Sequence, residues 1–185
     1  MILHYKKIIG NKVYLSPRST EDAEKYTEWL NNFDVAQYIV MHTKIMTVDV
    51  EREYLGKVST DSYDFAIVDN KTDELIGSIG LEHINNINRT AELGVFIGDN
   101  DHLSCGYGSE AIMLILDYGF NFLNLNNIML RVFDFNIRAI KAYKKCGFKE
   151  FGVWKDSHYA GGQYHDVIYM NITRDEFNKN RETKM

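Results

Sequence analysis

Residues 90–111, TAELGVFIGDNDHLSCGYGSEA, predict a strand, a glycine-containing loop and the start of a helix in direct succession. The strand is expected over 90–97, where Val, Phe and Ile gather. Gly106 and Gly108 follow, and glycines let successive backbone N–H groups approach an anion closely. A helix N-terminus adds unsatisfied donors and a positive dipole, so a diphosphate can bind there without a lysine. The alternative is a tight strand-to-helix turn that binds nothing.

The residues after this loop predict a crossover unit. Small and apolar residues recur in one helical stripe, at Ala111, Ile112, Ile115, Leu116, Gly119, Phe120 and Leu123. Ile128–Phe133 then predicts a strand, so strand, loop, helix and strand follow in the order of a parallel crossover. A second helix is expected over 136–145, ended by Gly147 in a left-handed conformation.

The residues before the loop predict an antiparallel meander. Two runs rich in Ile, Val and Phe, Asp64–Val68 and Leu75–Ile84, are joined by a polar turn at 70–73. A second polar turn at 85–88 leads into the strand at 90–97.

Shorter signals complete the predicted fold. They are a strand at Val13–Leu15, helices starting at the N-cap candidates Ser19 (to Leu30, with Asp22 as a box-like partner) and Thr47, strand material at Trp154 and Val167–Ile172 around a Gly161-Gly162 turn, and a terminal helix at Asp175–Lys179. The predicted class is α+β, with a central mixed, mostly antiparallel sheet and helices on both faces. No linker or repeat divides the chain, so we expect a single domain over 1–185 with its core at about 12–173.

Composition and charge exclude several kinds of partner. The chain has 185 residues and a formal net charge of −5, with Lys and Arg scattered singly or in pairs. A nucleic acid needs a concentrated positive face, so no nucleic-acid partner is expected. No apolar run reaches the ~18 residues that span a bilayer, and the N-terminus lacks a secretory signal. We therefore expect a cytoplasmic protein with no membrane partner.

The cysteines and histidines give no metal-binding pattern. Cys105 and Cys146 lack CxxC spacing, and the histidines lack HExxH spacing, so no metal is expected. Cys105 is expected to be a buried turn residue rather than a nucleophile, because no dedicated base accompanies it.

The segment from Asn136 to Phe148 carries the second functional signal. Asn136 and Tyr143 are separated by about two helical turns, so both project from one side of the helix. Asn136 can cap the helix or bond an amide-containing ligand. Tyr143 can be a core aromatic or can present its hydroxyl to a ligand.

Together these segments resemble the GNAT acetyltransferase superfamily, from about Val13 to Ile172. Within it, the chain resembles the branch of ribosomal-protein N-terminal acetyltransferases and spermidine N-acetyltransferases. Residues 90–98 resemble that branch's fourth strand, residues 136–148 its N-x-x-A-x-x-x-Y-x-x-x-G-F pattern, and residues 162–167 its C-terminal hairpin. Three matches in one order are more specific than any one of them. The resemblance implies acetyl-coenzyme A (acetyl-CoA) as co-substrate and no metal.

The resemblance also implies how coenzyme A (CoA) binds. The strand edge near Phe96 and Ile97 would pair with the pantetheine amides where this strand splays from the next. The family loop often begins with Gln or Arg, and Leu103 stands at that position here, so a side-chain contribution is lost while the backbone donors remain. The implied coenzyme-binding residues are Phe96, Ile97, Leu103, Ser104, Cys105, Gly106, Tyr107, Gly108, Ser109, Asn136, Ala139 and Tyr143.

Tyr143 and a carboxylate are the implied catalytic groups. A phenol has a pKa of ~10 and a thiol one of ~8.5, so the Tyr143 hydroxyl would stay protonated and donate to the departing thiolate. The amine would attack the thioester directly, with no enzyme nucleophile. Its proton would pass, through water, to Glu92, which the resemblance favours, or to Glu82, which its placement suggests.

The acceptor stays open between two classes of primary amine. They are the N-terminal α-amine of a protein and a small polyamine, and the acidic balance favours a cation. A protein of another class, a CoA-binding sensor or interaction module without turnover, is the alternative to an enzyme. By analogy, the exposed strand edges of such sheets make a homodimer an option.

Overall fold

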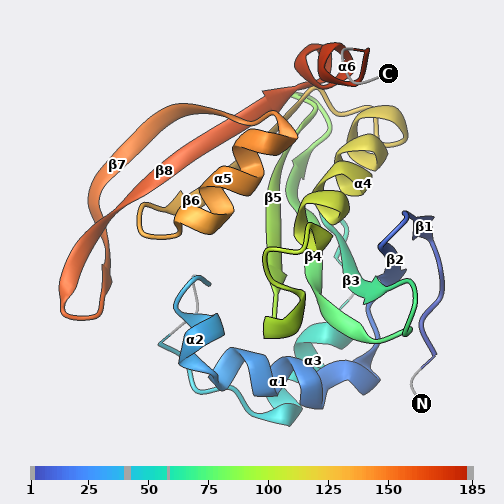
Figure 1. The fold of residues 1–185 in the computed structure, drawn as a ribbon, viewed down its shortest axis with the longest axis vertical. Helices are drawn as coiled ribbons and strands as arrows, with labels where there is room; N and C mark the ends of the chain where they lie inside the picture. The colour runs from blue at the N-terminus through green and yellow to red at the C-terminus, as the bar shows by residue number, and fades with distance from the viewer. Residues whose placement is uncertain (1–2, 40–42, 58, 183–185) are drawn as a thin grey trace.

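The computed structural model of the protein describes residues 3–39, 43–57 and 59–182, which fold around one sheet of eight strands (Figure 1). The strands lie in the order β1-β2-β3-β4-β5-β6-β8-β7. Their bounds are β1 Ile8–Ile9, β2 Val13–Pro17, β3 Tyr63–Asp69, β4 Leu75–Asn85, β5 Thr90–Ile97, β6 Asn127–Phe133, β7 Lys149–Ala160 and β8 Gln163–Thr173. The helices are α1 Ala23–Asn31, α2 Phe33–Ala36, α3 Val48–Gly56, α4 Tyr107–Asn121, α5 Ile137–Cys146 and α6 Arg174–Glu182, with 3-10 helices η1 at Thr20–Asp22 and η2 at Asn100–His102.

The sheet is mixed, with a single parallel pair among the strands described. Neighbouring strands run antiparallel except β5 and β6, which are parallel and are joined by the crossover helix α4. Asp69 and Asn85 hold the two turns of the β3–β4–β5 meander, because each side-chain oxygen accepts backbone N–H groups from two and three residues later. The predicted meander, crossover and mixed sheet are confirmed.

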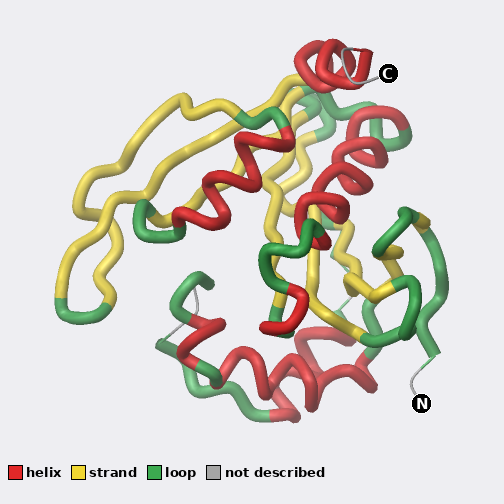
Figure 2. Tube along the Cα trace, viewed as in Figure 1, coloured by secondary structure: helices red, strands yellow, loops and turns green. Residues whose placement is uncertain are grey.

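Helices cover both faces of the sheet, in two groups (Figure 2). Alternate residues of a strand point to opposite faces, so the neighbours Tyr14 and Leu15 enter different cores. Leu15 packs in the core that α4, α5 and α6 close, together with Ile115 of α4. Tyr14 packs in the smaller core that α1, α2 and α3 close, together with Tyr26 of α1. The predicted α+β class is confirmed.

The pairing of β5 with β6 is short, and this opens the sheet at its centre. The parallel register runs from Thr90 opposite Asn127 to Glu92 opposite Met129, and ends there. β6 continues to Phe133 against β8, while β5 continues to Ile97 against β4. In the described chain, residues 93–97 therefore have no strand on the β6 side.

Helix boundaries follow the predicted capping residues in most cases. Thr47 caps α3 by accepting from the Val50 amide at 3.3 Å, and Gly147 ends α5 with a φ of 102°. Ser19 caps η1 instead of an α-helix. Its expected box partner, Asp22, does not complete the box, because both carboxylate oxygens lie 3.1 Å from Nε2 of His4.

Two elements were not predicted from the sequence, and three others are longer than predicted. β1 and α2 are too short to show a period. β7 and β8 form a hairpin longer than the predicted strand material, since β7 is an edge strand exposed along most of its length and lacks a clear alternation. The terminal helix α6 is also longer than predicted.

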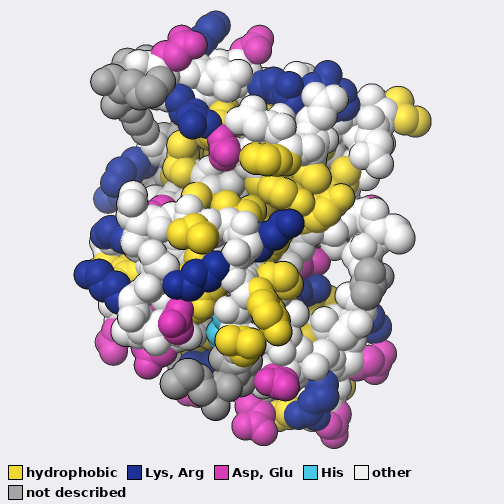
Figure 3. Space-filling model, turned by 90° about the vertical axis from the view of Figure 1, so that its right-hand side faces the viewer, with side chains coloured by type: hydrophobic (Ala, Val, Ile, Leu, Met, Phe, Trp, Pro, Cys, Tyr) yellow, Lys and Arg dark blue, Asp and Glu magenta, His cyan; other side chains and the backbone are white. Residues whose placement is uncertain are grey.

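Lys and Arg side chains are spread over the face shown in Figure 3, among acidic and hydrophobic side chains. They do not gather there into one positive patch. Among the helices of the described residues, none is both long and apolar enough to span a membrane.

Candidate active site

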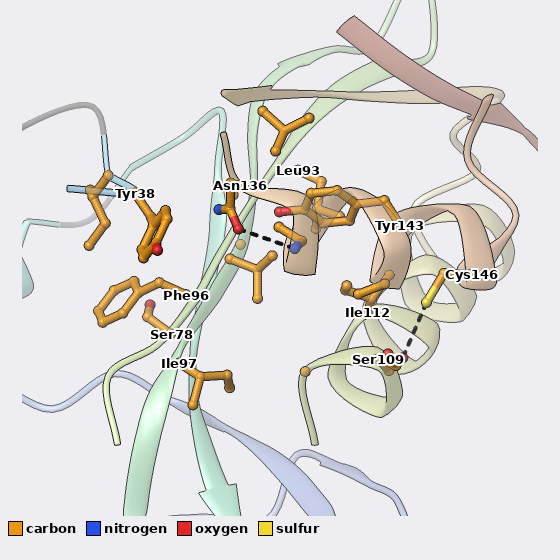
Figure 4. A pocket seen from close by; sticks show the side chains of 18 of the residues that line it. Tyr38, Ser78, Leu93, Phe96, Ile97, Ser109, Ile112, Asn136, Tyr143 and Cys146 are labelled. Carbon is orange, nitrogen blue, oxygen red and sulfur yellow. Dashed lines mark hydrogen bonds between the residues drawn. The ribbon is translucent and has the colours of Figure 1, made fainter. Parts of the chain in front are cut away.

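A cleft of ≈ 1770 Å³ crosses the molecule where β5 and β6 diverge. On one side its lining includes Ser109 of α4 and Tyr143 of α5, and on the other it includes Asp64 and Glu82. Side chains of β5, α4 and α5 point into it from separate directions (Figure 4). A pocket for one drug-sized ligand has roughly 300–1,000 Å³. This cleft therefore has room for a long ligand and a second, smaller one.

The glycine-containing loop ends in a helix start that no side chain caps, within the residues described. Ser104 and Gly106 have positive φ values of 61° and 89°, and α4 begins at Tyr107. The Glu110 amide closes the first turn by donating to the Gly106 carbonyl at 3.0 Å. The amides at the start of the turn can therefore donate to an anion, which fits a diphosphate.

The end of β5 lies beside this loop. A Cβ on Gly108 would meet Cγ1 of Ile97 at 3.6 Å, an ordinary contact, so the loop and the strand end are in close reach. The Phe96 ring packs edge-on against Tyr26 and Trp29, with 6.1 Å between centroids in each pair. The Phe96 backbone lies along the open edge of β5, beyond the end of its pairing with β6.

Asn136 performs the capping role at the start of α5. Its Oδ1 accepts from the Ala139 amide at 3.1 Å. The NH₂ of the same side chain is not used by the cap, and Asn136 lines the cleft. The capping and ligand-binding interpretations of Asn136 are therefore compatible.

Tyr143 is buried between α5 and the sheet, with 7% of its surface exposed. Its ring packs edge-on against Phe148, and its hydroxyl end lies toward Leu93 and Asn136 (Figure 4). Burial, and next the neighbouring Cys146 thiol, raise the pKa of Tyr143 above its usual value. The hydroxyl is therefore held in its protonated form near neutral pH. Cys146 in turn lies 3.6 Å from the Ser109 carbonyl and ties α5 to the first turn of α4.

Glu92 lies at the point where β5 and β6 separate, and it is paired. Arg131 Nε donates to Glu92 Oε1 at 2.6 Å. This ion pair occupies one oxygen of the Glu92 carboxylate. Glu92 is thus better placed to hold Arg131 at the mouth of the opening than to accept a proton.

Glu82 lies opposite Glu92 in the β4–β5 register. Burial is the main cause that raises its pKa, and the Asp64 carboxylate raises it further. Its Oε1 lies 3.5 Å from the position that a Cβ on Gly94 would take. Asp64 lies over Gly80 of β4 and forms an ion pair with Arg18 at 3.2 Å. The cross-strand pair Gly80 and Gly94 leaves the sheet open to these two carboxylates.

Comparisons with known proteins show which family has this fold and cleft. Residues 12–149 match the Acetyltransferase (GNAT) domain family. The chain is 30% identical to the uncharacterized N-acetyltransferase p20 of Bacillus licheniformis, over 90% of this chain and 95% of the relative. It is 30% identical to spermidine N(1)-acetyltransferase of Vibrio cholerae, over 80% of this chain and 84% of the relative. The crystal structure of the Vibrio cholerae spermidine N-acetyltransferase with CoA and spermine is similar at a TM-score of 0.82 and 28% identity, over 91% of this chain and 99% of that one.

The chain belongs to the GNAT acetyltransferase family. This GNAT protein is an enzyme that transfers acetyl from acetyl-CoA to an amine, as the sequence predicts. The sensor alternative is set aside. Among the described residues of the GNAT domain, no cluster of His, Cys, Asp or Glu is placed to hold a metal.

One residue of the GNAT loop differs from its prediction. Cys105 is exposed instead of buried, because the loop turns its side chain outward while its carbonyl accepts from Lys12 Nζ at 2.7 Å. Arg18, Asp64 and Arg131 also line the GNAT cleft without having been singled out from the sequence. Each meets its partner across strands or loops, and no local spacing reveals such contacts.

Proposed function

We propose that this enzyme acetylates a primary amine of a small polyamine. The observation that carries the proposal is the set of carboxylates on the α1–α3 side of the cleft, where Glu51 joins Asp64 and Glu82. Carboxylates grouped beside a low-dielectric wall attract a cationic acceptor. The similarity to spermidine acetyltransferases supports the same substrate class.

The coenzyme is proposed to enter from the α4–α5 side. The amides of Gly106–Ser109 would hold its diphosphate, and the open edge of β5 at 93–97 would pair with the pantetheine amides. The Asn136 NH₂ and the start of α5 near Ala139 would contact the same arm. The uncapped start of α4 and the early end of the β5–β6 pairing support this placement.

In this arrangement the opening between β5 and β6 joins two reactants that come from opposite faces. The acceptor amine would attack the thioester carbonyl from the carboxylate side, forming the new C–N bond. The C–S bond would then break, and the departing thiolate would take the proton of the Tyr143 hydroxyl. The buried position of Tyr143 in the lining of the cleft, where its hydroxyl stays protonated, supports this role.

We assign the acceptance of the amine's proton to Glu82, through water, rather than to Glu92. A base that works near neutral pH benefits from a raised pKa, and Glu82 has one. Glu92 is held by Arg131 at 2.6 Å, so one of its carboxylate oxygens is already engaged. The proposal thus reverses the order of preference that the sequence suggested.

A protein N-terminal α-amine is the second candidate acceptor. The observation that favours it is an apolar wall of the cleft that includes Val35, Tyr38 and Phe133. Tyr38 also carries the Arg138 guanidinium at 5.6 Å from its ring centroid. Such a wall can hold the side chains that follow a peptide's first residue.

A release assay separates these acceptors. CoA thiol release would be measured with spermidine, with a monoamine of similar length, and with peptides that have free or blocked N-termini. We expect kcat/KM to be highest with spermidine and to fall when Asp64→Asn removes one of the carboxylates. If the peptides with free N-termini give the higher kcat/KM and spermidine gives no thiol release, the acceptor is a protein N-terminus and not a polyamine.

We also propose the domain organisation, the location and the oligomeric state of the enzyme. The continuous sheet from Ile8 to Thr173 supports a single domain. The free thiol of Cys105 supports a cytoplasmic location. The edge strand β7 exposes Phe151 and Trp154, which supports a homodimer that covers this edge, and light scattering would measure its mass.

A further inference from the structure

We propose that Lys12 binds the diphosphate of CoA from outside the glycine-containing loop; this inference rests on the coenzyme site proposed above. Lys12 lies on the turn between β1 and β2, far from the loop in sequence. Its Nζ donates to the Cys105 carbonyl at 2.7 Å and lies 3.6 Å from the position that a Cβ on Gly106 would take. The ammonium group also lies 5.5 Å from the centroid of the Tyr107 ring. Lys12 thus brings a cation to the start of α4.

The turn that carries Lys12 is braced against the same helix. Glu110, in the first turn of α4, accepts hydrogen bonds from the amides of Asn11 and Lys12 through one oxygen, at 2.8 Å for Lys12. On the other side, the Asn70 amide donates to the Lys12 carbonyl at 2.8 Å. The backbone of Lys12 is therefore held in place relative to the loop. Less conformational entropy is then lost when its side chain orders on a ligand.

The charge of Lys12 is available to an anion. Residues 103–109 carry no charged side chain, and Leu103 stands where the family often has Gln or Arg. The ion pairs of the described residues do not include Lys12, whose hydrogen-bond partner is a neutral carbonyl. The nearby His102 is different, because its ring nitrogens lie 3.4 Å from Asp69 and 3.2 Å from Asp99. A lysine from the β1–β2 turn would therefore supply the positive charge that the loop itself lacks.

Calorimetric titration of the coenzyme-free protein tests this inference without relying on turnover. Dissociation constants would be measured for CoA and for 3′-dephospho-CoA, with wild type, Lys12→Gln, Lys12→Arg and the matched surface control Lys7→Gln. We expect Lys12→Gln to raise the dissociation constants of both ligands about tenfold, which corresponds to the loss of one charge-assisted hydrogen bond. Lys12→Arg should keep most of the affinity, and Lys7→Gln all of it. The difference in the dissociation constant for CoA between wild type and Lys12→Gln should become smaller as salt is added.

Each other outcome overturns the inference in a different way. Unchanged CoA affinity in Lys12→Gln means that Lys12 does not contact the coenzyme. A loss confined to CoA, with dephospho-CoA unaffected, assigns Lys12 to the 3′-phosphate. An equal loss in Lys12→Arg, unaffected by salt, means that Lys12 acts on the shape of the loop. Failure of wild type to bind either ligand would instead remove the coenzyme site itself.

Discussion

The hydroxyl group of Tyr143 is the part of the side chain that can donate a proton, while its ring packs in the core. Tyr143→Phe removes that group and keeps the ring against Phe148. We expect kcat to fall by about 10²-fold or more, the usual contribution of a general acid. The dissociation constant for CoA should change little, because the ring and the loop remain. Steady-state kinetics and calorimetry measure the two quantities, and an unchanged kcat would remove Tyr143 as the acid.

The assignment of the base also turns on single residues, and pH separates them. A carboxylate base works when ionised, so kcat/KM should rise with pH through the raised pKa of Glu82, which burial and then Asp64 shift upward. We expect Glu82→Gln to flatten this rise. Glu92→Gln is the matched control and should keep it. The opposite pattern in the two pH profiles would return the role to Glu92.

At the scale of an element, α6 shows how local chemistry starts a helix at the end of the chain. Thr173 and Glu176 form a capping box, in which Glu176 Oε2 accepts from the Thr173 amide at 3.0 Å and from its hydroxyl at 2.9 Å. The other oxygen accepts from Lys149 Nζ of β7 at 2.7 Å. α6 is thereby joined to the edge of the sheet, and Phe177 enters the core beside it.

This box predicts a pH-dependent contribution to stability. The hydrogen bond from Lys149, and next that from the Thr173 amide, lower the pKa of Glu176 from 4.5 to about 2. A lowered carboxyl pKa adds stability above pH 4.5, and that stability is lost as pH falls toward 2. We expect Glu176→Gln to lower Tm at pH 7, with a smaller difference from wild type at pH 3. Thermal unfolding at the two pH values measures this difference in Tm, and Asp175→Asn is the control in the same turn. The same difference in Tm at pH 7 and pH 3 would contradict the prediction.

At the scale of the whole molecule, the proposed coenzyme site joins elements that the sheet alone does not hold together. CoA would contact β5, α4 and α5 at once. A ligand that binds the folded state alone adds about 2.7 kcal/mol at 100 times its dissociation constant. For a domain of this size we expect Tm to rise by roughly 5–11 °C.

Thermal unfolding with and without CoA measures this shift in Tm. Two variants of the loop test where the diphosphate binds. Gly108→Trp should abolish the shift, because an indole would fill the space of the diphosphate. Gly108→Ala should keep most of it, since its Cβ would make an ordinary contact with Ile97 at 3.6 Å. A full shift with Gly108→Trp would contradict the placement of the diphosphate.

The elements around the loop could be predicted because their signals are local. The period of α4, the run of β5, the cap at Thr47 and the left-handed Gly147 each depend on residues a few positions apart. β1 and α2 were missed because they are too short for a period. β7 was predicted only at Trp154, because its exposed edge lacks alternation. Asn136 and Tyr143 could be singled out from the sequence because they share one local motif, and both line the cleft.

The sequence by itself determined the α+β class, the order of the elements and the family to which the chain belongs. Only the tertiary structure decided which carboxylate is paired with an arginine and which cation reaches the loop. Glu92 meets Arg131, Glu82 meets Asp64, and Lys12 meets Cys105 across long stretches of chain. Such contacts form when strands pair and turns pack, and no local period records them. The pKa of a carboxyl and the reach of an ammonium group therefore had to be found in the folded molecule.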